Sequence, residues 1–538
     1  MLCKLCDSLN VTDLLKLARA NSGKIFGSDD YLYFEHHKRY DGLVAAASSG
    51  CELCLVLQQH CEEEEIESFW RDDALTREQI FRTMEAEDQL KFVEGVRIGQ
   101  FVLDGNLASE TNFDIARGWM NTCILEHSKS KCPSFEDKLL PSRVISVGAK
   151  DTDPFLILTN GVKGKYIALS HCWGGQIDTS LTTSNLQSLQ NKIKMSNLPA
   201  NFRDAVLITR ALRIEFLWID SLCIIQDSKY DWEVESKNMG DVYRNCVLTI
   251  AAAAAAYKAA DGILHNPTQR RHDTKPKLKL SKDSGPDDVV EIVGASRQQE
   301  DLQTLCSSGP LQSRAWTLQE KILSSRILWY GRRQIYWQCL CGYQSADGIP
   351  SSGRGLPESY FNYTAVTQKL IHSKSYSDGP NISKIELFDI NCEYQTMIED
   401  YSRRNLSYPS DKLPAFSGIA ALIHKTLGGH YLAGIWSKFF RENLLWYKEV
   451  LKASHTKPYR APSWSWAVTD ERVPLDNFSK GTTIDNRLVS TPYDPVLVSH
   501  HVEPSGENPY GSVKYAHMIV DALTLKLFFV DRYRTRSN

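Results

Sequence analysis

The sequence has no long apolar run. The longest, from Cys246 to Tyr257, is mostly alanine and is far shorter than the ~20 residues that a membrane-spanning helix needs. The opening stretch MLCKLCDSLNVTDLLKLARA lacks the continuous apolar segment and small-residue cleavage site of a secretory signal. We therefore expect no membrane span and a cytoplasmic location, where cysteines stay reduced or bind metal rather than form disulfides.

The sequence also lacks an excess of either charge. Lys and Arg number 62 against 65 Asp and Glu, which gives a formal net charge of −3. Because no global field attracts nucleic acid, we expect no nucleic-acid partner. No unit of about 20 to 50 residues repeats, which argues against a solenoid or propeller. Phosphate-binding glycine loops of the GxGxxG or GxxxxGK kind are also missing from strand-to-helix positions.

The chain of 538 residues is long enough for two or three domains. We predict an N-terminal block over residues 1–150, which opens with paired cysteines, and a middle block over residues 160–345, in which apolar runs alternate with amphipathic stretches. A C-terminal block over residues 346–538 begins after the loop SADGIPSSGRGLPES, whose glycine, proline and serine mark a linker. This last block is expected to be α+β and to pack on the middle block.

The middle block predicts an α/β fold with a mostly parallel sheet. YIALS, FLWID and VLTIA have the composition of buried strands. PANFRDAVLITRALRI places its apolar residues at helical spacing, and a second helix is expected over DWEVESKNMGDVYRN. Strands that alternate with helices favour a sheet covered on both faces. In RAPSWSWA, tryptophans alternate with serines, which indicates a strand with one aromatic face.

Polar residues follow two of these strands directly. In open parallel sheets, ligands bind beyond the carboxyl ends of the strands. Four candidate ligand-binding residues stand there, namely Ser170, His171, Trp173 and Asp220. The alternative is that His171 and Trp173 only cap the core.

Glu235 is the candidate catalytic residue. On a helix, Trp232, Glu235, Met239 and Val242 share one face, so this carboxylate stands on an otherwise apolar stripe. It must be hydrogen-bonded or ion-paired there, or have a raised pKa, and such groups are common at functional sites. Arg314 is a candidate for binding a phosphate or carboxylate. It can equally form a structural ion pair with Asp220 or Glu235.

Two CxxC pairs near the N-terminus are typical of a structural zinc site with four thiolate ligands. The predicted ligands are Cys3, Cys6, Cys51 and Cys54, with His36 or His37 as a possible replacement for one of them. The alternative is that Cys51 and Cys54 are small buried side chains on a helix. A further group, Cys123, His127 and Cys132, is less specific, and we assign it to the core.

The middle block resembles a known family. YIALSHCWGG, LWIDSLCIIQDSKYDWEVESKNMGDVYRNCVLTIAAA and SRAWTLQEKILSSRILWY are similar, in order and spacing, to the signature segments of the fungal heterokaryon-incompatibility (HET) domain over about residues 165–340. Ala315 departs from the glycine that the family usually has at this place. The resemblance implies a role in fungal non-self recognition, in which fusion of incompatible cells triggers growth arrest and programmed cell death. A protein recognition partner and self-association are then expected.

The HET domain is in turn distantly similar to the TIR domain, a flavodoxin-like fold with some members that cleave NAD. This more distant resemblance implies NAD as a substrate, with Glu235 as the catalytic carboxylate, Trp173 stacked on a ring and Arg314 on a phosphate. Two alternatives stay open, a non-catalytic signalling module and an enzyme that modifies a small molecule on the same fold. Fold likeness alone does not decide among them.

Overall fold

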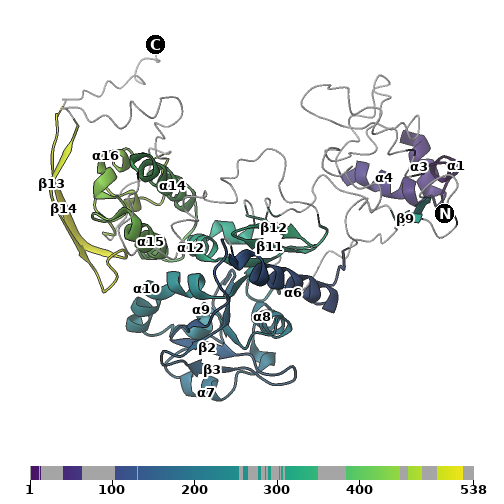
Figure 1. Cartoon of the computed structure of the whole chain (residues 1–538), viewed down its shortest axis with the longest axis horizontal. Coiled ribbons are helices and arrows are strands. Elements are labelled where there is room, and N and C mark those ends of the chain that lie inside the picture. The colour runs from purple at the N-terminus through teal and green to yellow at the C-terminus, as the bar shows by residue number, and fades with distance from the viewer. Residues whose placement is uncertain are drawn as a thin grey trace, which may run out of the picture. The chain divides into compact units, whose positions relative to one another are not determined.

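The protein is described from a computed structural model (Figure 1), which groups the chain into two compact units. One comprises Met1–Val102 and Thr268–Glu300, and the other Leu103–Pro267 and Asp301–Asn538. The residues that the structure describes are 2–10, 13, 40–63, 103–129, 131–253, 258–264, 277–279, 285, 289–291, 302, 305–306, 309–348, 383–448, 459–474 and 494–524. Residues 103–150, which the sequence analysis groups with the N-terminal block, thus share a unit with the middle block.

The first unit contains short helices and a hairpin. The helices are α1 (Lys4–Asp7), α3 (Tyr40–Ser48) and α4 (Glu52–Glu63), and the strands are β8 (Lys277–Lys279) and β9 (Val289–Glu291). Gly50, with φ of 88°, makes the turn between α3 and α4, a conformation that favours glycine. Leu43, Leu53 and Leu278 pack with the cysteines of this unit into a small core. His36 and His37 lie outside the described residues.

An eight-stranded sheet forms the centre of the second unit, in the order β12-β11-β10-β7-β5-β6-β2-β3. Four strands are parallel, β5 (Tyr166–Ser170), β6 (Phe216–Trp218), β7 (Leu248–Ala252) and β10 (Arg326–Tyr330). The outer strands are antiparallel, β2 (Arg143–Ser146), β3 (Phe155–Leu158), β11 (Ile335–Cys339) and β12 (Gly342–Ser345). The three predicted central strands are confirmed. The sheet is mixed rather than mostly parallel, because β2–β3 and β10–β11–β12 are joined by connections too short for a parallel crossover.

The helices between the strands cover opposite faces of the sheet. α8 (Ala200–Ala211) connects β5 to β6, whereas α10 (Lys229–Asn245) leads back from β6 to β7 on the other side of β5. Right-handed crossovers that run in opposite directions place their helices on opposite faces. The contacts agree, since His171 packs on Phe202 of α8 while the Tyr166 hydroxyl donates to the Val242 carbonyl of α10 at 2.6 Å. Both predicted helices are therefore confirmed.

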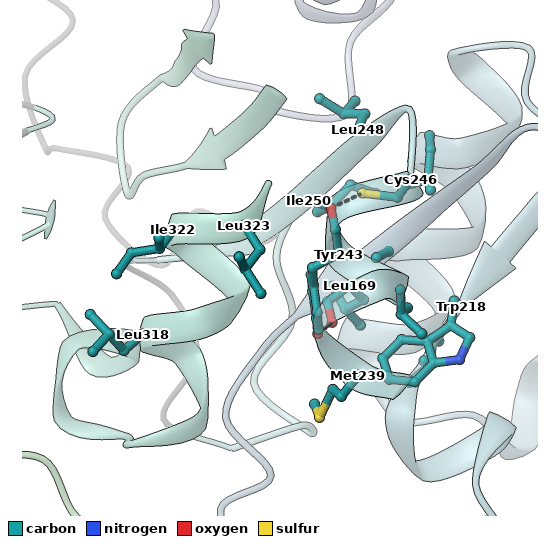
Figure 2. Close-up of a cluster of buried hydrophobic side chains, with 14 of the residues drawn as sticks. Leu169, Trp218, Met239, Tyr243, Cys246, Leu248, Ile250, Leu318, Ile322 and Leu323 are labelled. Carbon is teal, nitrogen blue, oxygen red and sulfur yellow. Dashed lines mark hydrogen bonds between the residues drawn. The ribbon is translucent and has the colours of Figure 1, made fainter. Parts of the chain in front are cut away.

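The core lies between the sheet and α10 with its neighbour α12 (Trp316–Leu323). Figure 2 shows Met239 and Tyr243 of α10 between Trp218 of β6 and the aliphatic side chains of α12. The rings of Trp218 and Tyr243 meet edge to face, with their centroids 5.7 Å apart. Burying large aromatic side chains in this layer stabilises the position of α10 against the strands.

C-terminal helices pack on this α/β core (Figure 1). They are α14 (Lys384–Ser402), α15 (Ser417–Leu427) and α16 (Phe440–Asn443), followed by the hairpin β13 (Val496–Pro504) and β14 (Val513–Asp521). RAPSWSWA is not a strand, because Trp466–Val468 form the short 3-10 helix η9. Along the described part of the chain, every helix is too short or too polar to span a bilayer.

The remaining elements of the second unit are short, apart from α6 (Glu110–Leu125), which packs on β11. They are η2 (His127–Lys129), β1 (Lys138–Leu139), β4 (Lys163–Gly164), α7 (Leu186–Asn191), η3 (Met195–Asn197), α9 (Asp220–Cys223), η4 (Pro310–Ser313), η6 (Pro409–Lys412), η7 (Pro414–Phe416) and η8 (Ser437–Phe439).

Candidate functional site

The candidate site lies beyond the carboxyl ends of β5, β6 and β7. In the sheet, β5 lies between β6 and β7. The connection from β5 to β6 runs toward one edge of the sheet, and the connection from β6 to β7 runs back toward the other, so the strand order reverses at β5. Such a switch point leaves a crevice between the loops that leave the two strands in opposite directions. Ser170 ends β5 and Asp220 follows β6, so both predicted residues stand at this edge.

Asp220 holds Trp173 in place. The indole Nε1 of Trp173 donates to Asp220 Oδ2 at 2.7 Å, and the other carboxylate oxygen accepts from the backbone N–H of Ser221 at 2.7 Å. Gly174 and Gly175 follow with φ of 67° and 136°, which lets the chain turn sharply after the indole. β5 therefore ends here, because the hydrogen bond between Trp173 and Asp220 and the two glycines that follow turn the chain away from the sheet.

His171 is buried with a neutral ring. Burial lowers the pKa of His171 to about 4, because the imidazolium would lose its hydration, and the positive charge of Arg314 acts in the same direction. No described residue bonds its Nε2. Arg314 donates through Nη1 to the carbonyl oxygen of His171, so this guanidinium binds backbone rather than Asp220 or Glu235.

Glu320, on α12, is the buried carboxylate of this edge. It is 3 % exposed and accepts a hydrogen bond from Ser170. Burial raises the pKa of Glu320 to about 7, although the charge of Arg314 and the hydrogen bonds from Ser170 and Tyr243 act in the opposite direction. Its Oε2 has no partner among the described residues. Glu320 is not among the site residues predicted from the sequence. The signal that could have found it is a carboxylate between Leu318 and Ile322 on a short apolar helix.

Two cavities flank the segment from Ser170 to Trp173. The smaller, of about 20 Å³, is lined by Ser170, Glu320 and the β7 residues Thr249 and Ala251, and has room for about one water molecule. The larger, of about 310 Å³, is lined by Trp173, Gly174 and residues 197–199 and 258–260 among others. The larger volume lies at the lower end of the range for small-molecule sites.

Glu235 lies in a different contact network. Its carboxylate is 3.3 Å from Arg143 Nη2, and the same nitrogen binds both oxygens of Asp231 at 2.6 and 2.7 Å. Arg143 Nε donates to the Cys223 carbonyl at 2.6 Å, so β2, α9 and α10 meet at this guanidinium. Burial raises the pKa of Glu235, against the effects of Ser142 and Arg143. Glu235 thus has the buried donor that its helix position requires, and its catalytic role stays a prediction.

In the first unit, the four predicted zinc ligands come together. The Sγ atoms of Cys6 and Cys54 are 3.6 Å apart, those of Cys3 and Cys54 are 3.9 Å apart, and the N–H of Cys3 donates to Cys51 Sγ at 3.2 Å. All four sulfurs lie within 4.8 Å of one another. Thiolates around a tetrahedral zinc stand about 3.8 Å apart, since each Zn–S bond is about 2.3 Å long. These residues fit a metal ion.

A second group of potential metal ligands lies in the other unit. It consists of Cys123, His127, Cys132 and Cys339. From the sequence we assign the first three to the core. Cys339 is not among the predicted ligands, because it is far away along the chain. Their proximity follows from the packing of α6 on β11.

Comparison with known proteins identifies the central segment. Residues 166–320 match the family model described as heterokaryon incompatibility protein (HET). The match covers Ser170, Asp220, Glu235 and Glu320. Searches of curated proteins and of solved structures found no match.

Proposed function

Because the chain carries a heterokaryon-incompatibility domain over residues 166–320, we propose that it acts in fungal non-self recognition and triggers growth arrest and cell death. The observation that carries this proposal is the family match, which spans the polar edge at the switch point of the sheet. The protein acts in the cytoplasm and responds to a protein partner. Self-association then passes the signal on.

The chemistry that this edge supports best is NAD cleavage. The parallel strands have the spatial order second, first, third, fourth, which agrees with that part of the flavodoxin-like order and supports the TIR-like resemblance. In the reaction, the bond between nicotinamide and ribose C1′ breaks, water supplies a hydroxyl to C1′, and nicotinamide and a proton leave. The cleft beside Trp173 receives a ring, and a nearby carboxylate stabilises the positive charge that develops on the ribose.

Glu320 is better placed than Glu235 to be this carboxylate. It shares the edge with Ser170 and has one oxygen without a described partner, whereas Glu235 is bound to Arg143. With a pKa of about 7, Glu320 is ionised in a substantial fraction of molecules at neutral pH. A nucleotide reaches it only if the cavity of about 20 Å³ widens on binding.

A non-catalytic signalling module is the second candidate. The small volume of the cavity beside Glu320 favours it, and so does the internal pairing of the polar residues at the edge. In that case Ser170, Asp220 and Glu320 fix the fold, and the domain acts through its surface.

The test uses purified full-length protein with NAD. We expect wild type to release nicotinamide and Glu320→Gln to release none, with a melting temperature at or above that of wild type. Glu235→Gln is measured in parallel. Should it alone abolish turnover without a change in melting temperature, Glu235 is the catalytic carboxylate. If wild type kills fungal cells but releases no nicotinamide, the protein is a signalling module.

In the first unit, we propose that Cys3, Cys6, Cys51 and Cys54 bind one structural zinc ion. The support is the close approach of their four sulfurs, three of which are on buried residues. We expect Cys51→Ser to lower the zinc content by about one ion per chain.

A further inference from the structure

Three potential metal ligands follow one another where α6 ends. Cys123 lies in the last turn of α6, and His127 begins η2. The backbone N–H of Cys132 donates to the carbonyl of His127 at 3.1 Å, which brings the chain back toward α6. The spacing Cys-x3-His-x4-Cys therefore gathers two sulfurs and an imidazole in one tight turn.

The fourth ligand comes from the sheet. Cys339 ends β11, and its Sγ is 3.4 Å from Nδ1 of His127. The ligand atoms of Cys123, His127, Cys132 and Cys339 all lie within 4.8 Å of one another. In a tetrahedral zinc site, Zn–S bonds of about 2.3 Å and Zn–N bonds of about 2.0 Å place neighbouring ligand atoms about 3.6 to 3.8 Å apart. The observed arrangement is close to this geometry.

We propose that these four residues bind a second zinc ion, which fastens α6 to the antiparallel edge of the sheet. The three cysteines are buried, with exposed fractions of 0 %, 4 % and 5 %. A buried site with four protein ligands leaves no position for a substrate, so the ion is structural. It joins the segment before the HET domain to a strand that follows it.

Arg326 supplies an independent argument. This guanidinium is 2 % exposed, donates through Nε to Cys123 Sγ at 3.1 Å and through Nη2 to the Pro133 carbonyl at 2.5 Å. Within the described ranges, no carboxylate forms an ion pair with it. A buried cation needs a compensating negative charge. Three thiolates and a neutral imidazole around Zn²⁺ carry a net charge of −1, which balances Arg326, whereas three neutral thiols do not.

Cys341 is the rival ligand and provides the control. Its Sγ is 3.8 Å from that of Cys132, but the residue is exposed and lies in the turn after β11. Burial therefore selects Cys339 as the ligand. Replacing Cys341 should leave the metal in place.

The experiment measures zinc in the full-length protein purified without chelators. We expect about two ions per wild-type chain, about one in Cys339→Ser and about two in Cys341→Ser. Cys51→Ser removes the other ion, so the two sites are counted separately and one can fail without the other. Unchanged zinc in Cys339→Ser, or an equal loss in Cys341→Ser, would overturn the proposal.

A second measurement does not depend on the folding of Cys339→Ser. Zinc-edge X-ray absorption of Cys51→Ser/Cys54→Ser, in which the N-terminal site is removed, should show about three sulfurs and one nitrogen around the remaining ion. Absence of zinc from this protein, or a shell of sulfur only, contradicts the assignment.

Discussion

Two buried carboxylates of the HET domain, Glu235 and Glu320, have different hydrogen-bonding and charged neighbours. Glu235 has a guanidinium beside it, whereas Glu320 has the hydroxyl groups of Ser170 and Tyr243 and the charge of Arg314. Burial raises the pKa of both, because the ionised form loses hydration. The sequence could predict that Glu235 stands on a buried face. It could not predict the partner, since Arg143 comes from a strand far from α10 along the chain.

The pKa of Glu320 predicts a pH-dependent stability. Its folded-state pKa is about 7 and its ordinary value 4.5, so the unfolded chain releases this proton at lower pH. The folded state therefore loses stability as pH rises from about 4.5 to about 7, by on the order of 3 kcal/mol. The lowered pKa of His171 has the opposite effect on stability as pH rises. His171 is present in both wild type and Glu320→Gln, so its contribution cancels when these two proteins are compared.

The measurement is the difference in unfolding free energy between wild type and Glu320→Gln, taken by urea denaturation across this pH range. We expect wild type to lose stability relative to the variant as pH rises. A difference that does not change with pH shows that Glu320 titrates normally.

Arg143 predicts a large effect of one substitution. Its side chain is 8 % exposed and holds Asp231 and Glu235. Removing one partner of a buried ion pair leaves an uncompensated charge, so we expect Arg143→Met to cost about 3 to 5 kcal/mol. Lys514→Met is the control, because its pair with Glu503 is exposed to solvent and its loss should not change the stability measurably. Equal small effects in chemical denaturation would count against the buried network.

At the scale of elements, α10 and α15 approach closely at two glycines. A Cβ added to Gly240 would lie 2.8 Å from the Cα of Gly418, and one added to Gly418 would lie 2.7 Å from Gln319 Oε1. The Cβ added to Gly418 would also lie 2.9 Å from the Cα of Gly240, so the two helices meet backbone against backbone and this contact cannot be relieved by rotating a side chain. It fixes the C-terminal helices on the HET core.

This close approach predicts that Gly240→Ala destabilises the protein by about 1 to 3 kcal/mol through overpacking. Gly118→Ala is the matched control in α6, where an added Cβ meets nothing within 4 Å. There we expect a gain of about 0.5 to 1 kcal/mol, because alanine is the better helix former. Thermal melting of both variants checks the opposite signs.

The hydrophobic periodicity of the sequence was sufficient to predict the central helices and strands, but not which strands run parallel or antiparallel. The apolar faces of α8 and α10 and the short apolar runs of β5, β6 and β7 follow from local sequence. Strand polarity depends on connection length, and the turns that make the outer strands antiparallel carry no strong sequence signal. In RAPSWSWA, the alternation of tryptophan and serine wrongly predicts a strand. Trp466 instead begins a 3-10 helix, and its Nε1 donates to the Gly434 carbonyl at 2.6 Å, a tertiary contact that the local sequence does not indicate.

At the scale of the whole molecule, two clusters of metal ligands differ in how predictable they are. The local CxxC spacing brings Cys3 close to Cys6 and Cys51 close to Cys54. Only the proximity of the two pairs to each other has to be taken from the structure. Cys339 joins the second cluster through the packing of α6 on β11, which no spacing in the sequence indicates.

Helices from outside the segment that matches the HET family model pack on the second unit's sheet and helices. α15 packs on α10, and α6 packs on β11. The polar edge at the switch point of the sheet is the part to which we assign the chemistry, with Glu320 as its carboxylate.

The most direct test follows NAD and viability in the same fungal culture after expression of the protein is induced. With wild type, we expect NAD to fall before the cells stop growing, whereas NAD and growth should both stay unchanged with Glu320→Gln expressed at the same level. Cell death with NAD unchanged would contradict it.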